Sequence, residues 1–238
     1  MNGHVLIIIE CLIIQPMVYT TLFFDLDDTL YAPTTMLWEA IRSRMGTYMV
    51  ERLNIPAEQV DDLRRHYLEN FGTTLRGLQH FYPVDTEEYL HFVHNLPLAE
   101  YIQPDARLRP LILSLPQKRW IFTNADEAHA RRVLQVLNLE NCFMGIIDVR
   151  AMGFANKPQP EAYLKALQIA QVDDPEQCIL LDDALRNLAP ASKLGFTTIL
   201  VNPNPADADS NGFKPHYAIP DLFALPSILP DLWEEIDH

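Results

Sequence analysis

The sequence predicts an α/β protein: a doubly wound parallel sheet with an all-helical cap inserted after the first strand. Short runs rich in β-branched and aromatic residues recur along the chain and show little polar/apolar alternation, as is typical of parallel strands covered on both faces. Stretches with helical spacing separate these runs. This alternating β/α order is the pattern from which a parallel sheet with helices on both faces is built.

The elements of the sheet can be placed in order along the chain. Strands are expected at 21–25, 119–124, 144–149, 178–183 and 197–202. Amphipathic helices are expected at 126–138, 160–171 and 186–194. We interpret 202–215 as a polar loop rich in Pro and Asp, after which the apolar tail is expected to pack back on the sheet.

The alternation of strands and helices is interrupted after the first strand. Residues 32–109 show helical periodicity and no convincing strand, with helix starts indicated by Pro56 at a first-turn position and by Asp85 ahead of two glutamates. We therefore expect a helical cap domain at 32–109 and a core domain made of 17–31 and 110–238. Residues 1–16 are expected to be an apolar extension that is dispensable or untranslated, with Met17 as the start; an added edge strand is the alternative. Their apolar run is too short to span a bilayer.

Composition limits the classes of partner. The chain has 238 residues, with 18 Lys and Arg against 32 Asp and Glu, which gives a formal charge of −14. Such a charge repels nucleic-acid polymers and anionic lipid, so neither is expected as a partner. The three cysteines show no CxxC spacing and indicate neither a disulfide framework nor a zinc site. A cytoplasmic protein, monomeric or homodimeric, is the simplest expectation.

Polar residues end several of the expected strands. In a parallel sheet the functional crevice lies outside the carboxyl ends of the strands, so these side chains should converge. Carboxylates gathered in this way favour a hard cation such as Mg²⁺. A carboxylate held there can act as a nucleophile, and one two residues later can act as general acid and base. The residues are Asp25 and Asp27, Thr123 and Asn124, and Asp182 and Asp183.

Two further groups suit a phosphoryl substrate. Thr123 and the backbone of Asn124 can hydrogen-bond phosphoryl oxygens, and Lys157, at the start of a helix, can supply positive charge. The histidines at 80, 91, 94 and 129 lack the further ligands that a zinc-type site needs, so surface or packing roles are expected. His129 lies nearest the predicted crevice.

Five motifs occur together and in order along the chain: "FFDLDDTLY" (23–31), "GTTLRGL" (72–78), "FTNADEAHARRVL" (122–134), "KPQPEAY" (157–163) and "LLDDALRNL" (180–188). As a set they resemble the haloacid dehalogenase-like (HAD) phosphohydrolases, and within them the pyrimidine 5′-nucleotidase branch. The resemblance implies a nucleophile and metal ligand at Asp25, and at Asp27 a general acid/base whose backbone carbonyl also binds the metal. An acid/base at position 27 is also what the dehalogenases of the superfamily lack.

The resemblance further implies that Thr123 orients the phosphoryl group, that Lys157 neutralises it, and that Asp183 completes a magnesium site with Asp182 beside it. Ala184 and Asn187 depart from the family pattern and leave the division of work between the two aspartates open.

The resulting hypothesis is a magnesium-dependent phosphomonoesterase that works through an aspartyl-phosphate and acts on pyrimidine nucleoside 5′-monophosphates. A broad phosphatase of sugar phosphates or phosphoglycolate, and a non-catalytic metabolite-binding protein, are the alternatives. Residues 72–75 and Tyr31 are expected to line the substrate cavity, although a turn at Gly72 with ordinary packing explains the same pattern.

Overall fold

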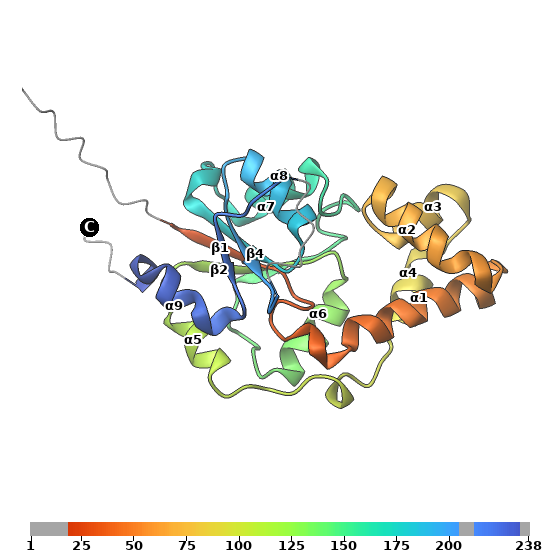
Figure 1. Cartoon of the computed structure of the whole chain (residues 1–238), viewed down its shortest axis with the longest axis horizontal. Helices are drawn as coiled ribbons and strands as arrows, with labels where there is room; N and C mark the ends of the chain where they lie inside the picture. Colours follow the sequence, from red (N-terminus) through yellow and green to blue (C-terminus); the bar gives the residue numbers. More distant parts are fainter. Residues whose placement is uncertain (1–18, 205–211, 234–238) are drawn as a thin grey trace, which may run out of the picture.

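The computed structural model describes residues 19–204 and 212–233. The expectation for residues 1–16 therefore lies outside the described residues. One parallel sheet, in the order β3-β2-β1-β4-β5-β6, forms the centre of the molecule (Figure 1). Its strands are β1 (Thr21–Phe24), β2 (Lys118–Phe122), β3 (Gly145–Ile147), β4 (Cys178–Asp182), β5 (Thr197–Val201) and β6 (Tyr217–Ile219).

The predicted strands are confirmed, with two differences. Each ends one or two residues earlier than expected. The edge strand β6 was missed, since three residues after a polar loop carry too little pattern to identify. It pairs with β5 in register, with Ile199 opposite Tyr217.

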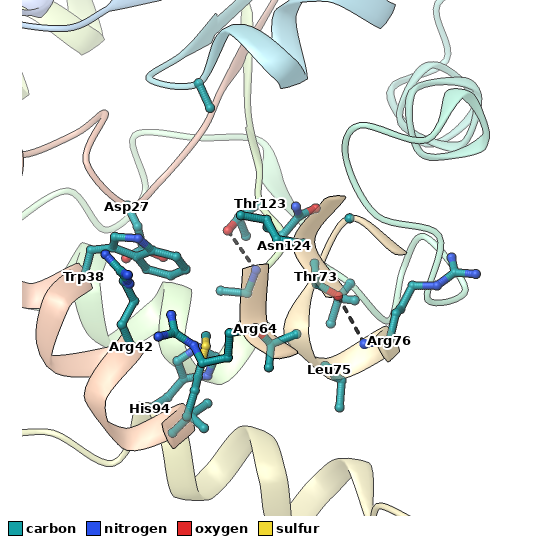
Figure 2. Close-up of a pocket in the computed structure, with 18 of the residues that line it drawn as sticks. Asp27, Trp38, Arg42, Arg64, Thr73, Leu75, Arg76, His94, Thr123 and Asn124 are labelled. Carbon is teal, nitrogen blue, oxygen red and sulfur yellow. Dashed lines mark hydrogen bonds between the residues drawn. The ribbon is translucent and has the colours of Figure 1, made fainter. Parts of the chain in front are cut away.

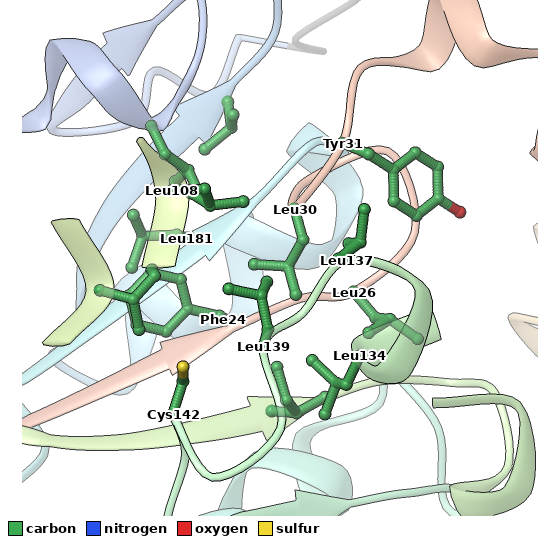
Figure 3. Packing of buried hydrophobic residues seen from close by; sticks show 14 of the residues in the cluster. Phe24, Leu26, Leu30, Tyr31, Leu108, Leu134, Leu137, Leu139, Cys142 and Leu181 are labelled. Atoms are coloured by element: carbon green, nitrogen blue, oxygen red, sulfur yellow. The ribbon is translucent and has the colours of Figure 1, made fainter. Parts of the chain in front are cut away.

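Helices cover both faces of the sheet, as the fold class predicts. They are α5 (Leu108–Ser114), α6 (Glu127–Val136), α7 (Pro160–Ala170), α8 (Leu185–Lys193) and α9 (Leu225–Ile228). Alternation along β1 divides them: Leu22 and Phe24 face the apolar cluster that contains residues of α5, α6 and α9. Phe23 faces the cluster formed with α7 and α8. Figure 3 shows Phe24, Leu108 and Leu134 in the first of these cores.

The tail packs back on the sheet as expected. Leu222, Leu225, Leu229 and Leu232 belong to the same buried cluster as Phe24. In 19–204 and 212–233, no helix has the length and apolar character needed to cross a membrane.

Helices follow β1, and most of their buried side chains form a third apolar cluster, which Val149 joins from outside the cap. The cap contains α1 (Leu37–Leu53), α2 (Val60–Phe71), α3 (Thr74–Phe81) and α4 (Thr86–His94), drawn in orange to yellow in Figure 1. The Asp85 side chain accepts hydrogen bonds from the backbone amides of Glu87 and Glu88, which confirms the predicted helix start. Pro56 instead precedes a short 3-10 turn at Ala57–Gln59, so the prediction that it opens the helix itself is wrong by one turn.

Candidate active site

The first strand delivers Asp25 to the crevice. Its backbone amide donates to the carbonyl oxygen of Leu181 at 2.9 Å, which fixes the residue just beyond the β1–β4 ladder. The Thr29 hydroxyl, one turn later in the loop, lies 3.4 Å from Asp25 Oδ2. Asp25 is 8% exposed, so burial raises the pKa of its carboxyl to about 7, with Lys157 opposing the rise and Asp182 adding to it.

Lys157 is a buried cation held between two carboxylates. Its ammonium lies 2.7 Å from Asp25 Oδ1 and 2.6 Å from Asp182 Oδ2. Burial acts to lower the pKa of Lys157, but the two carboxylates outweigh it and raise the pKa. Asn124 fixes the lysine backbone on both sides, accepting from its amide at 2.8 Å and donating to its carbonyl at 2.9 Å.

The two aspartates after β4 differ in surroundings. Asp182 is fully buried, and besides Lys157 it accepts from the Asn187 amide at 2.9 and 3.1 Å and from the Ala184 amide at 2.9 Å. Asp183 is only partly buried and lines the cavity. Burial and the neighbouring charges of Asp182 and Asp25 raise the pKa of Asp183 well above its usual value.

These carboxylates suit a divalent cation. One oxygen each from Asp25, Asp182 and Asp183 can be chosen so that the atoms lie within 4.8 Å of one another. Oxygen donors are what Mg²⁺ prefers, and a cation would relieve the repulsion that raises the pKa values of Asp25 and Asp183. Because the other partners of Asp182 already occupy its oxygens, Asp183 is the more available ligand of the two.

Asp27 stands apart from this cluster, with its own partners. Its Oδ1 accepts from the Tyr31 hydroxyl at 2.6 Å and lies 2.9 Å from His129 Nε2. Burial would raise the pKa of Asp27, but His129 and then Tyr31 outweigh it and lower the pKa. The carboxylate is therefore ionised in the free protein.

A second histidine lies against the first. His94, from the cap, stacks on His129 with ring centroids 4.3 Å apart, and its Nδ1 lies 2.9 Å from Asp126 Oδ2. Burial and then the neighbouring His129 lower the pKa of His94. The expected surface or packing roles hold for the exposed His80 and His91, whereas that expectation is incomplete for His129, which contacts a candidate catalytic carboxylate.

A cavity of about 820 Å³ lies between the strand ends and the cap (Figure 2). From the core it is lined by Asp25, Asp27, Thr123, Asn124 and Asp183, and from the cap by Gly72–Leu75, Arg42 and Arg64 among others. The expectation that 72–75 line the cavity is confirmed. Tyr31 is not among the lining residues, so that expectation is wrong; its hydroxyl is bonded to Asp27 instead.

The turn at Gly72 also explains the sequence there. Gly72 ends α2 with φ of 82°, and a Cβ at this position would come within 2.4 Å of the Asn156 side chain. Cap and core therefore approach each other closely beside Lys157, the residue after Asn156. Lys157 and Asp182 lie behind Asp25 and do not line the cavity themselves.

Several residues of the site were not found from the sequence. Arg42, Arg64, Tyr89 and His94 line the cavity and belong to none of the motifs, while Asp126, which bonds to His94, lies within the motif at 122–134 but was given no role there. The helical i,i+3 spacing of His91 and His94 was visible, but the partner of His94 proved to be an aspartate 32 residues along the chain.

A parallel α/β sheet with carboxylates and a buried lysine at its strand ends, under a helical cap, defines a class of hydrolase. The family model of the haloacid dehalogenase-like hydrolases matches residues 19–195. The chain belongs to this family.

A curated protein is similar to part of the chain. Phosphate metabolism protein 8 of Saccharomyces cerevisiae is 26% identical over 192 residues, which are 75% of this chain and 60% of that protein. The chain thus spans about 60% of the length of this curated relative.

Solved structures share the fold. The HAD-hydrolase YfnB of Bacillus subtilis, bound to magnesium, has a TM-score of 0.59 at 20% identity and matches 89% of this chain and 99% of its own. A HAD phosphatase of Thermococcus onnurineus has a TM-score of 0.61 at 19% identity, with 88% and 97% covered. L-2-haloacid dehalogenase of Xanthobacter autotrophicus reaches 0.57 at 16% identity, with 90% and 99% covered. At these identities the likeness is one of fold.

Proposed function

We propose that this hydrolase is a magnesium-dependent phosphomonoesterase that passes through an aspartyl-phosphate on Asp25 and acts on pyrimidine nucleoside 5′-monophosphates. The observation that carries the proposal is the separation of two carboxylates at one cavity. Asp25 is bonded to Lys157 beside Asp183, whereas Asp27 is bonded to Tyr31 and His129. This separation supports attack by one group and proton transfer by the other.

The domain arrangement in this proposal follows the sequence expectation. Residues 17–31 and 110–238 form the catalytic core, and residues 32–109 form a cap that closes the cavity to water. We further propose that the enzyme is cytoplasmic, a monomer or homodimer, and acts on small phosphorylated metabolites.

Asp25, Asp183 and the backbone carbonyl of Asp27 would hold Mg²⁺, with Asp182 beside them. The ion would supply positive charge to the phosphoryl oxygens and keep the carboxylate of Asp25 ionised. The fit of the site to this ion is the clustering of carboxylate oxygens and their raised pKa values.

The residues of the chain account for both chemical steps. In the first, the carboxylate of Asp25 attacks phosphorus while Asp27 donates a proton to the departing nucleoside oxygen. The negative phosphate raises the pKa of Asp27 on binding, which favours its protonated form. In the second, Asp27 takes a proton from water, which attacks the phosphoryl group and releases Asp25.

Other residues hold this arrangement. Lys157 fixes Asp25 Oδ1 and places positive charge directly behind the nucleophile. Asp182 accepts from Asn187 and holds the lysine in turn, so Asn187, which departs from the family pattern, has a structural role. Thr123 and the Asn124 backbone line the cavity where phosphoryl oxygens would bind.

A broad phosphatase acting on sugar phosphates or phosphoglycolate would use the same groups, so the substrate must be tested directly. The experiment is phosphate release by the purified protein with Mg²⁺ from UMP, CMP, AMP, GMP, glucose 6-phosphate and phosphoglycolate, with Asp25→Asn as the control for contaminating phosphatase.

We expect turnover concentrated on UMP and CMP, lost in the variant and lost reversibly with EDTA. Turnover spread over the sugar esters would reassign the substrate. Metal-independent turnover would contradict the proposed magnesium site. An absence of turnover on every ester would favour the metabolite-binding alternative.

A further inference from the structure

The cap presents a group of polar side chains to the cavity, opposite the strand ends. We call Arg42 of α1, Arg64 of α2 and Tyr89 of α4 the cap polar cluster; all three line the cavity. Figure 2 shows Arg42 and Arg64 on the cap side, across the cavity from Thr123 and Asn124. None of the three takes part in the proposed chemistry.

Two atoms of this cluster are buried without a hydrogen-bond partner among the described residues. They are Nε of Arg64 and the hydroxyl oxygen of Tyr89. The Arg64 side chain is only 13% exposed, and its contact with Asp61 spans 3.5 Å to a carboxylate that is itself 86% exposed. An ion pair with such an exposed partner contributes little to stability, whereas an unsatisfied buried polar group lowers stability by about 1–3 kcal/mol. Two such groups on one cavity wall indicate a ligand that supplies acceptors.

The neighbouring arginines on this wall are already engaged. Arg76 donates to the carbonyl oxygen of Phe154 and to the side chain of Gln159, so it ties α3 to the core. Arg42 pairs with Glu39 at 3.1 Å. Arg64 is the cavity-lining arginine whose Nε is buried without a hydrogen-bond partner within the described residues.

A flat apolar surface lies next to the cluster. Trp38 is on α1, one turn before Arg42, and lines the same cavity while remaining 37% exposed. Figure 2 shows its indole beside Arg42. An indole offers a large face on which a planar ring can stack.

The charge balance favours a neutral acceptor over a second anion. Glu39 and Asp61 lie beside Arg42 and Arg64 and offset their charges. What remains is a set of N–H and O–H donors next to an aromatic face. The base of a pyrimidine nucleotide matches this set, because it is planar and carries a ring carbonyl oxygen.

We infer that Arg64 and Tyr89 are specificity-determining residues that donate hydrogen bonds to the base of the leaving nucleoside, with Trp38 covering one face of its ring. The inference rests on the proposed phosphatase function and adds the means by which its substrate is chosen.

The test compares two esters that differ in the base alone. Ribose 5-phosphate keeps the sugar and phosphate of UMP and has no base. In Arg64→Met and Tyr89→Phe, kcat/KM for UMP should fall about tenfold or more, the effect of losing one good hydrogen bond, while that for ribose 5-phosphate changes less than about twofold. Tyr89→Phe should also raise the Tm of the ligand-free protein, because it removes an unsatisfied buried hydroxyl.

Matched controls come from α1, another helix of the cap. Arg52→Gln alters an α1 arginine that pairs with Glu88 outside the cavity lining, and Tyr48→Phe alters a ring packed edge-on against Tyr89. Neither should change the ratio of the two rates. Arg64→Lys, which keeps the charge and loses the Nε–H, carries the test if Arg64→Met does not fold.

Equal losses on both esters, or no loss on UMP, would overturn the inference. A wild-type enzyme that hydrolyses ribose 5-phosphate and not UMP would overturn it as well, while leaving the phosphatase chemistry in place. A wild-type protein inactive on every ester would instead overturn the proposed function.

Discussion

The two walls of the cavity are built in opposite ways. On the core wall, Asp25 accepts a bond from Lys157, which lies behind it, also donates to Asp182 and has its backbone held by Asn124. On the cap wall, Arg64 Nε and the Tyr89 hydroxyl have no partner among the described residues. The groups that we propose to react are thus fixed by hydrogen bonds in the free protein, whereas the groups we assign to recognition have polar atoms without a partner until a ligand binds.

The largest effect should come from the core wall at Asp27. Asp27→Asn keeps the bond-accepting oxygen for Tyr31 and His129 and removes the proton transfer, so kcat on UMP should fall about 10²- to 10⁴-fold. Steady-state phosphate release measures this, with circular dichroism to confirm folding. An unchanged kcat on UMP would contradict the acid/base role of Asp27.

Breaking the buried ion pairs should cost stability. Lys157→Met leaves two buried carboxylates without their cation, and the free energy of unfolding should fall by about 3–5 kcal/mol at neutral pH, as measured by urea unfolding. The loss should shrink as the pH falls, because the stranded carboxyls become protonated. Lys165→Met, at an exposed site on α7, is the control and should change little. A loss no larger than in this control would contradict the account.

The cap wall depends on close packing between α2 and α3. A Cβ on Gly77 would lie 2.1 Å from Cγ of Tyr67, so Gly77→Ala should lower the free energy of unfolding by about 1–3 kcal/mol. In Gly46→Ala the added Cβ meets Val60 at 3.2 Å, a contact that a small shift relieves, and the change should stay below about 1 kcal/mol. Thermal unfolding of the pair distinguishes them, and equal Tm values would show that the cap tolerates the displacement.

The smallest effect is expected where the two walls meet, at His94. Burial, followed by the nearby His129, lowers the pKa of His94 below its ordinary value of 6.5. The unfolded chain then binds the proton more readily than the folded one, so stability should decline as the pH falls below about 6.5. Burial acts to raise the pKa of Asp126, but the combined effects of His94 and His129 lower it to about 2, so Asp126 loses its contribution only at much lower pH.

His94→Asn should flatten this slope between pH 7 and about 5 in urea midpoints, since the group that takes up the proton on unfolding is gone. An unchanged slope in the variant would assign the pH dependence to other groups.

The sequence predicts the core wall far better than the cap wall. Asp25, Asp27, Asp182 and Asp183 lie at or within three residues of the carboxyl ends of β1 and β4, so strand polarity alone brings them to one edge. The contact of His129 with Asp27 joins residues 102 positions apart and depends on how α6 packs on the sheet. Arg64 and Tyr89 meet at the cavity only through the packing angles of cap helices, which no local pattern encodes.

The departures from the family pattern show the same limit. Asn187 was visible as an unusual residue, but its bonds to Asp182 depend on the first turn of α8 lying against the end of β4. The strand ends were overestimated for a related reason: residues such as Thr123 and Asn124 remain compatible with an extended backbone while their side chains belong to the site.

The most direct test of the central claim is to find the phosphoryl group on the protein. Asp27→Asn and the wild type would be mixed with UMP and Mg²⁺, quenched in acid within the first turnover, and digested for mass spectrometry. We expect one added phosphoryl group on the peptide that contains Asp25 in the wild type, formed more slowly in Asp27→Asn because the variant lacks the group that protonates the leaving oxygen. Phosphate release with no phosphoryl group on that peptide, together with an active Asp25→Asn protein, would contradict the account.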